Sequence, residues 1–143
     1  MIIRNMKEKD IPQVCIIENE TFSKPWKDHD FLASINSEDN IYLVVEWDEQ
    51  IVAYCGLWGV IEEGHINNVA VVRTHQNRGI AYSMLEELIK RAREKGLESF
   101  TLEVRVGNVN AIKLYEKLGF KKIGIRPSFY DKPREDGLIM WLY

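Results

Sequence analysis

The fold is decided by the segment Gln76-Asn77-Arg78-Gly79-Ile80-Ala81, which follows the apolar run Val69-Ala70-Val71 and opens a long helix. Backbone N–H groups at a helix start have no helical partner, and the macrodipole adds roughly half a positive charge there. Gly79 has no Cβ and Ala81 has a small one, so an anion can approach the backbone closely. Arg78 can add a charge-assisted hydrogen bond. The segment therefore predicts a diphosphate site, although a glycine before a helix is equally compatible with simple turn chemistry.

The residues on either side of this segment predict a mixed α/β (α+β) fold. Apolar residues recur at Met84, Leu85, Leu88 and Ile89, as on the buried face of a helix, and Gly96 ends that helix. The expected order along the chain is β-α-α-β-β-β-α-β-α-β-β, which places helices against a mixed sheet. We expect helices from Asp10, which can cap the first of them, over 28–35, from Gly79 and over 108–118. We expect strands over 1–5, 41–46, 51–60, 65–72, 99–104, 121–126 and 138–142.

The composition is that of an ordinary globular protein. Its 143 residues predict a single domain, residues 1–143, and no repeat or linker divides the chain. Nineteen Lys and Arg against 22 Asp and Glu give a charge of -3, which offers no reason to expect binding to nucleic acid or to an anionic membrane. We find no secretory signal, no run of about 20 apolar residues and no Cys-x-x-Cys pair, so we expect a cytoplasmic protein with reduced thiols.

Two motifs resemble those of a known family. Val69-Ala70-Val71, the loop Gln76-x-x-Gly79-x-Ala81 and the helix after it are similar to the coenzyme A site of the GNAT acetyltransferases. The second motif of that family is matched by Asn108-x-Asn110-Ala111-x-x-Leu114-Tyr115-x-x-x-Gly119-Phe120. The resemblance implies the GNAT fold: a mixed, mostly antiparallel sheet of six to seven strands, splayed at the acetyl-CoA site, with helices on both faces.

The family resemblance also implies a set of residues that hold acetyl-CoA as cosubstrate. The pantetheine arm would lie in a V between residues 65–72 and 99–104, where it would pair with backbone groups near Val69 and Val71. Asn108 would contact the coenzyme, although it can also cap the following helix. The expected coenzyme-binding residues are Val69, Ala70, Val71, Gln76, Asn77, Arg78, Gly79, Ile80, Ala81, Tyr82, Asn108 and Tyr115.

A narrower resemblance is to the bacterial ribosomal-protein-alanine N-acetyltransferases. It rests on Phe22-x-x-Pro25-Trp26, on Leu102-Glu103-Val104-Arg105 and on the segment from Arg126 to Met140. It implies a protein N-terminus as acceptor, the alanine of a small-subunit ribosomal protein, and a monomer or weak dimer. The chain departs from the family pattern at Arg73, Ala81, Gly137 and Lys27, which bears on the acceptor more than on the activity.

Acetyl transfer to an amine requires a base for the amine and an acid for the departing thiolate. Glu103 is the candidate base, because it is a carboxylate in an otherwise apolar strand and matches the register of the family. A solvent-facing Glu103 remains open, as does a base among Glu62, Glu63 and His65. Tyr115 is the candidate acid, since a phenol of pKa ~10 is protonated at neutral pH. A core tyrosine with a satisfied hydroxyl is the alternative.

The acceptor is expected to be an α-amine. With a pKa of ~7.7–8.0 an α-amine is roughly 10–20% neutral at pH 7, whereas a lysine near ~10.4 is about 0.04% neutral. We expect Trp26, Phe129, Tyr130 and Glu135 to contact the acceptor, with a core role for Trp26 and a solvated acidic loop at Glu135 as alternatives. A lysine or small-amine acetyltransferase, or a non-catalytic acetyl-CoA-binding module, remain competing hypotheses. No metal is expected, because the three histidines are not spaced as ligands.

Overall fold

The structure, a computed structural model, describes residues 1–143. Its elements follow the predicted order. The helices are α1 (Ile11–Thr21), α2 (Asp28–Ile35), α3 (Ile80–Glu94) and α4 (Val109–Lys117), and short 3-10 turns lie at Glu8–Asp10 and Arg73–His75. The strands are β1 (Ile2–Asn5), β2 (Asn40–Trp47), β3 (Gln50–Val60), β4 (Glu63–Val71), β5 (Ser99–Arg105), β6 (Lys121–Asp131) and β7 (Arg134–Leu142).

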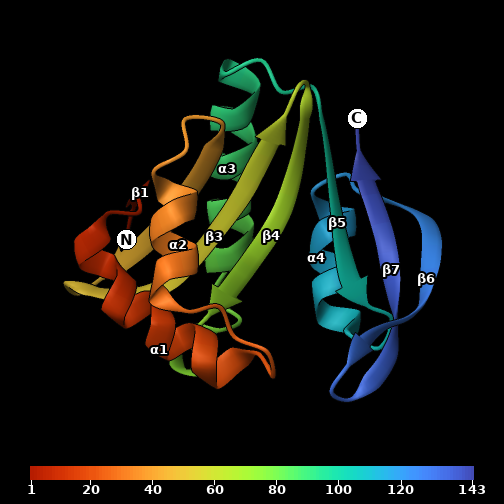
Figure 1. The fold of residues 1–143 in the computed structure, drawn as a ribbon, viewed down its shortest axis with the longest axis horizontal. Coiled ribbons are helices and arrows are strands. Elements are labelled where there is room, and N and C mark those ends of the chain that lie inside the picture. Colours follow the sequence, from red (N-terminus) through yellow and green to blue (C-terminus); the bar gives the residue numbers. More distant parts are fainter.

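The seven strands form one open sheet in the order β1-β2-β3-β4-β5-β7-β6. All neighbours are antiparallel except β4 and β5, which are parallel and pair over only three positions, from Glu63↔Ser99 to His65↔Thr101. Beyond His65 the two strands diverge, as Figure 1 shows between the yellow-green and teal arrows. The predicted mostly antiparallel, splayed sheet of the GNAT fold is confirmed.

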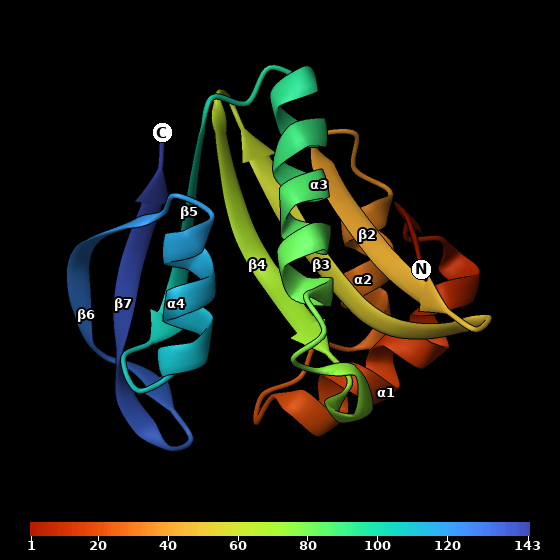
Figure 2. The same ribbon diagram turned by 180° about the vertical axis from the view of Figure 1, so that it is seen from behind.

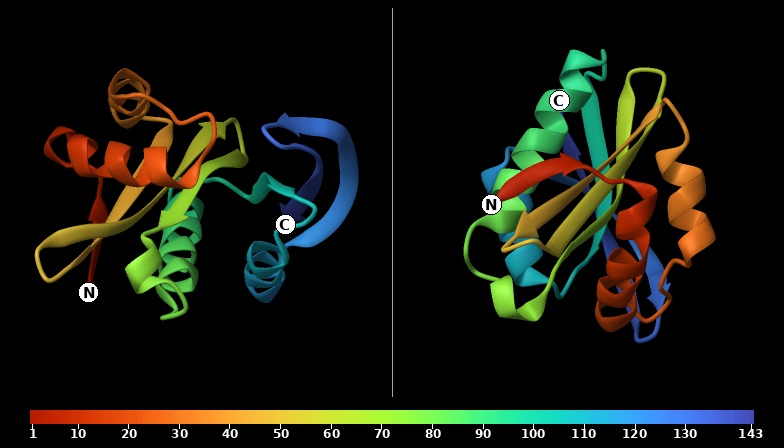
Figure 3. Two further views of the ribbon diagram at one scale, coloured as in Figure 1. Left: turned by 90° about the horizontal axis from the view of Figure 1, so that it is seen from below. Right: turned by 90° about the vertical axis from the view of Figure 1, so that its left-hand side faces the viewer.

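Helices cover both faces of the sheet. Helices α1 and α2 lie on one face, and α3 and α4 lie on the other, which Figure 2 shows from behind and Figure 3 from below. Alternate strand residues pack into two separate cores, one on each face of the sheet, as expected from the two-residue period of a strand. Leu43, Val45 and Cys55 pack with α3 and α4, whereas Val44 and Tyr54 pack with α1 and α2. Strands β2, β3 and β4 therefore offer one set of side chains to each helical layer.

Two local expectations need correction. Asp10 does not cap α1: its carboxylate accepts from Lys7 N at 2.8 Å and pairs with Arg4, so it closes the 3-10 turn before the helix instead. The last two strands are longer than predicted. Residues beyond the predicted ends, at 126 and 138, still pair across the hairpin, as far as Asp131↔Arg134. This extension carries Phe129 and Tyr130 out along β6.

Candidate active site

A groove of about 980 Å³ occupies the split between β4 and β5. Its walls are the diverging ends of these strands, Ile66–Val71 and Leu102–Arg105. The loop before α3 and the inner face of α4 close one end, and the α1–α2 connection and the β6–β7 turn close the other. The groove therefore exists because the β4–β5 ladder stops after three residue pairs.

The loop before α3 offers a run of unpaired donors at one end of the groove. The backbone N–H groups from Asn77 to Tyr82 donate to no backbone carbonyl, and the first bond of the helix runs from Ser83 N to Gly79 O at 3.1 Å. Left-handed backbone at Asn77 (φ 63°) and Gly79 (φ 79°) turns these groups outward. No atom lies within 4 Å of the place where a Cβ of Gly79 would stand. A diphosphate such as that of coenzyme A fits this cradle.

The edge of β4 beside the groove is also unpaired. Val72 N donates to Val52 O of β3 at 2.8 Å, so by alternation the backbone groups of Val69 and Val71 point toward the split. Gln76 Nε2 donates to Val71 O at 3.1 Å from that side. The pantetheine arm of coenzyme A contains amides, and the free N–H and C=O groups at Val69 suit them.

Arg78 is the predicted coenzyme residue that does not line the groove. Its guanidinium lies 5.6 Å from the ring centroid of Trp47, on the outer side of the loop. The groove is instead lined by Lys117 at the end of α4, whose Nζ lies 4.8 Å from the ring centroid of Tyr82 in the first turn of α3. No local sequence pattern singles out Lys117, because the contact joins two different helices.

Glu103 enters the groove from the α1/α2 face. Its strand neighbours Leu102 and Val104 belong to the core under α3 and α4, so alternation turns Glu103 the other way. Its side chain is 32% exposed, and Oε1 lies 3.6 Å from Arg126 Nε. The competing cluster lies at the closed end of the β4–β5 ladder, where His65 Nε2 is 3.4 Å from Glu63 Oε1, and it does not line the groove.

Tyr115 enters from the opposite face, on α4. Its ring packs edge-on against Phe120 with centroids 5.9 Å apart. The hydroxyl has no hydrogen-bond partner in the protein, and no buried side-chain oxygen is left unsatisfied, so this oxygen must face the groove. Burial raises the pKa of Tyr115, and the neighbouring Tyr130 raises it further. The phenol is therefore protonated throughout the neutral range, and the alternative of a core tyrosine with a satisfied hydroxyl does not hold.

Aromatic residues line the other end of the groove. Trp26 lines the groove, and it also packs in the core, on Phe31 at 5.2 Å and on Trp58 at 6.0 Å between ring centroids. Phe129 and Tyr130 line the facing wall. Burial raises the pKa of Tyr130 to about 12, and the negative charge of Glu103 contributes to this shift.

Glu135 and Asn108 hold the walls of the groove. Glu135 does not line it: Oε2 accepts from Gly107 N at 2.7 Å, and Oε1 lies 3.3 Å from Arg105 Nη1. Neither a direct acceptor contact nor a solvated loop describes this carboxylate, since it ties the β6–β7 hairpin to the end of β5. Asn108 caps α4, because its Oδ1 accepts from Ala111 N at 3.3 Å, and the residue also lines the groove, where its predicted contact with the coenzyme stays a prediction.

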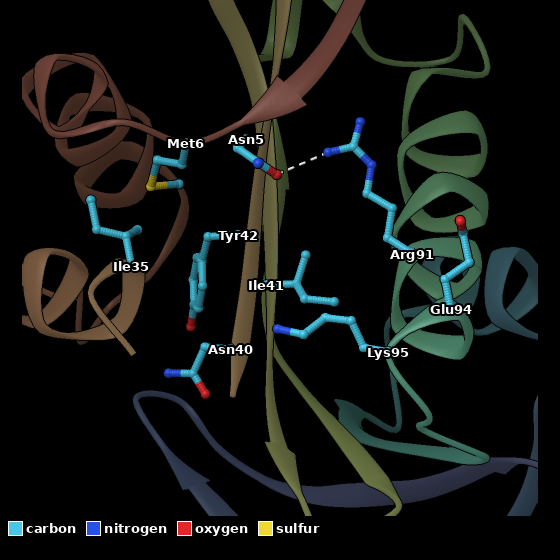
Figure 4. Close-up of a pocket in the computed structure, with 9 residues that line it drawn as sticks. All are labelled: Asn5, Met6, Ile35, Asn40, Ile41, Tyr42, Arg91, Glu94 and Lys95. Carbon is cyan, nitrogen blue, oxygen red and sulfur yellow. Dashed lines mark hydrogen bonds between the residues drawn. The ribbon is translucent and has the colours of Figure 1, made fainter. Parts of the chain in front are cut away.

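A second cavity, of about 440 Å³, lies at the β1 edge of the sheet, away from the groove (Figure 4). It forms because β1 ends at Asn5 and leaves the start of β2 uncovered. Arg91 points across it to Asn5 Oδ1 at 2.9 Å, and Lys95 donates to the Glu38 carbonyl. None of the predicted site residues lines this cavity. The structure contains no cluster of three or more potential metal ligands and no helix long and apolar enough to span a membrane.

Known proteins match this chain over nearly its whole length. Residues 11–120 match the model of the Acetyltransferase (GNAT) family. The [ribosomal protein bS18]-alanine N-acetyltransferase of Escherichia coli K12 is 32% identical over 142 residues, which cover 98% of this chain and 95% of the relative. The crystal structure of the E. coli ribosomal-protein-S18-alanine N-acetyltransferase superposes with a TM-score of 0.90 at 31% identity, covering 99% of this chain and 92% of that chain.

The same fold occurs in Arabidopsis thaliana NAA60 in complex with acetyl-CoA, with a TM-score of 0.88 at 18% identity over 99% of this chain and 97% of that one. The family match spans more than half of the chain and includes both motifs that border the groove. The chain belongs to the GNAT family of acetyltransferases.

Proposed function

We propose that this chain transfers the acetyl group of acetyl-CoA to the N-terminal α-amino group of a protein, and that the acceptor is the N-terminal alanine of ribosomal protein bS18. The observation that carries the proposal is a groove that passes through the sheet, with Glu103 on one face and Tyr115 on the other. The names of the relatives at 32–35% identity support this acceptor.

The coenzyme is held in the half of the groove that α3 and α4 border. Acetyl-CoA, when bound, supplies the acetyl group as a thioester. The N–H groups of residues 77–82 bind the diphosphate, and the free edge at Val69 and Val71 binds the pantetheine amides. The residues proposed for this role are Val69, Ala70, Val71, Gln76, Asn77, Gly79, Ile80, Ala81, Tyr82 and Asn108.

Glu103 and Tyr115 divide the proton transfers between them. Glu103 accepts a proton from the acceptor amine, directly or through water, and Arg126 orients its carboxylate. Tyr115 donates toward the sulfur that leaves, because its hydroxyl is protonated and otherwise unpartnered. The two groups act from opposite faces, so neither blocks the approach of the other's substrate.

The acceptor enters between Trp26 and the pair Phe129 and Tyr130. These walls are aromatic, and they accommodate an extended peptide end. We propose that residues 1–143 act as one domain, since both cores pack on one continuous sheet. We also propose that the protein is cytoplasmic and that it acts as a monomer or weak dimer, as the family resemblance implies.

The test is thiol release from acetyl-CoA with a peptide copying the N-terminus of bS18. A twin peptide with a blocked N-terminus and an internal lysine is the control. Turnover on the free N-terminus alone supports the proposal. Turnover on the blocked twin would move the acceptor to lysine, and coenzyme binding without turnover on any amine would indicate a binding module.

A further inference from the structure

Glu18 is a buried carboxylate in the groove wall to which the proposed proton transfers assign no role. It lies near the end of α1, is 2% exposed and lines the groove. No Lys, Arg or His lies within ion-pair distance of it, since it takes part in none of the salt bridges. A buried charge without a counter-ion is destabilising unless hydrogen bonds compensate it. Its hydrogen-bond partners therefore indicate its purpose.

These partners belong to two different layers of the molecule. Glu18 Oε1 accepts the hydroxyl of Tyr54, a fully buried residue of β3. Glu18 Oε2 accepts the backbone N–H of Trp26 at 2.9 Å. Burial raises the pKa of Tyr54, and the charge of Glu18 raises it further, so the hydroxyl remains a donor. The carboxylate thus joins the rigid centre of the sheet to the connection between α1 and α2.

The backbone of that connection is held at its two ends, where Phe22 N donates to Glu18 O at 3.0 Å and Lys27 N donates to Asp30 Oδ2 at 2.9 Å. Between these ends the N–H groups of Ser23 and Lys24 have no protein partner, and that of Trp26 has only the Glu18 carboxylate. The side chain of Lys24 pairs with Asp131 at 2.5 Å, but both are 63% exposed, and exposed pairs contribute little. The same connection lines the acceptor end of the groove through Phe22, Ser23, Lys24 and Trp26.

We propose that Glu18 is a positioning residue that determines acceptor selectivity. It fixes the backbone at Trp26, and through it the wall against which the first residue of the acceptor packs. The expected effect of Glu18 on peptide selectivity rests on the proposed function. Its effect on the connection between α1 and α2 does not depend on any substrate.

The decisive variant is Glu18→Met, which has a side chain of similar length but no oxygen to accept the Trp26 N–H. A glutamine would not be decisive, because its amide oxygen could still accept that N–H while its NH2 group donates to the Tyr54 hydroxyl. We expect KM for the alanine peptide to rise about tenfold, the scale of one lost hydrogen bond to a charged group, while KM for acetyl-CoA stays within about twofold. The preference for an alanine peptide over a methionine peptide should fall about fivefold or more, because the wall yields to larger side chains.

Glu20→Met is the matched control, since Glu20 is an exposed glutamate on the same helix. Tyr54→Phe removes the other anchor and should give a partial form of the same effect, which keeps the proposal testable if Glu18→Met does not fold. An unchanged selectivity and peptide KM in Glu18→Met and Tyr54→Phe, or an equal loss of coenzyme affinity, overturns the proposal.

Amide hydrogen exchange at Trp26 in the free protein provides the substrate-independent measurement. We expect exchange to accelerate in Glu18→Met and to stay unchanged in Glu20→Met. Unchanged exchange in Glu18→Met overturns the positioning role. If wild-type protein acetylates no peptide, the proposed function fails, and the exchange result still decides the role of Glu18.

Discussion

At the scale of single residues, the proposed chemistry depends on two side chains that reach one groove from opposite faces of a sheet. In these proposed roles Glu103 and Tyr115 can act on the amine and on the sulfur without competing for the same space. Tyr130 lies between them: it raises the pKa of Tyr115, and the charge of Glu103 raises the pKa of Tyr130.

Replacing Glu103 by Gln should lower kcat/KM for a peptide acceptor by about a hundredfold at pH 7. The loss should shrink about fivefold between pH 7 and pH 9, because an α-amine of pKa ~7.7–8.0 then loses its proton without help. The measurement is a pH–rate profile of wild type and variant on the same peptide. A wild-type-to-variant ratio that does not change with pH would exclude the base role.

Replacing Tyr115 by Phe should lower kcat about a hundredfold while leaving acetyl-CoA affinity within about twofold. Because the pKa of Tyr115 is raised, the wild-type hydroxyl stays protonated above the ordinary value of ~10. The wild-type rate should therefore show no fall attributable to this group up to about pH 10. A fall in kcat on approaching that pH in the wild type, absent from the Tyr115→Phe variant, would contradict the raised pKa of Tyr115. A kcat in Tyr115→Phe that stays close to that of the wild type would contradict the acid role.

At the scale of elements, α3 carries two left-handed glycines, one at each end. Gly79 precedes its first turn with φ 79° and Gly96 follows its last turn with φ 97°, and neither has an atom within 4 Å of a would-be Cβ. The two positions therefore share the same open surroundings and the same left-handed backbone, in which any other residue would be strained. Only the first faces the groove.

Gly79→Ala and Gly96→Ala form a matched pair of variants. Both should lose roughly 1 kcal/mol of unfolding free energy, because alanine is strained at positive φ. Only Gly79→Ala should weaken acetyl-CoA binding, by about tenfold or more, since its methyl group stands where the phosphates approach the N–H groups. Urea unfolding and coenzyme titration of both variants check this. Equal coenzyme affinity in the two would disprove the phosphate cradle.

At the scale of the whole molecule, the sheet is two halves joined at one narrow seam. Strands β4 and β5 share three residue pairs, and the groove takes the place of the rest of the ladder. A coenzyme that binds β4, the loop before α3 and α4 bridges these halves. Binding should thus act on the stability of the entire fold.

Acetyl-CoA at a hundred times its Kd should add about 2.7 kcal/mol to the unfolding free energy. Amide exchange should slow at Val69 and Val71 and along residues 77–82, where donors without partners gain acceptors. Denaturation and hydrogen exchange with and without the coenzyme measure both effects. Protection confined to the loop, with none along β4, would show that the pantetheine arm does not use this edge.

The sequence by itself determined the elements, their order, the two-sided layering and the glycine turn that opens α3. These features come from signals that act over a few residues, such as the spacing of Met84, Leu85, Leu88 and Ile89, or the glycines at either end of α3. It also carried an unused signal at Glu18, which stands one helical turn after Val14 and shares its buried face.

Only the tertiary structure decided the depth of the split, the faces from which Glu103 and Tyr115 enter, and the partners of the polar side chains. Glu18 meets Tyr54 across 36 positions, Arg105 meets Glu135 across 30 and Lys24 meets Asp131 across 107. Arg78 turns away from the groove toward Trp47 for the same reason. Side chains form hydrogen bonds and ion pairs with groups that lie near them in space. A chain that folds back on itself brings together residues that no local sequence pattern relates.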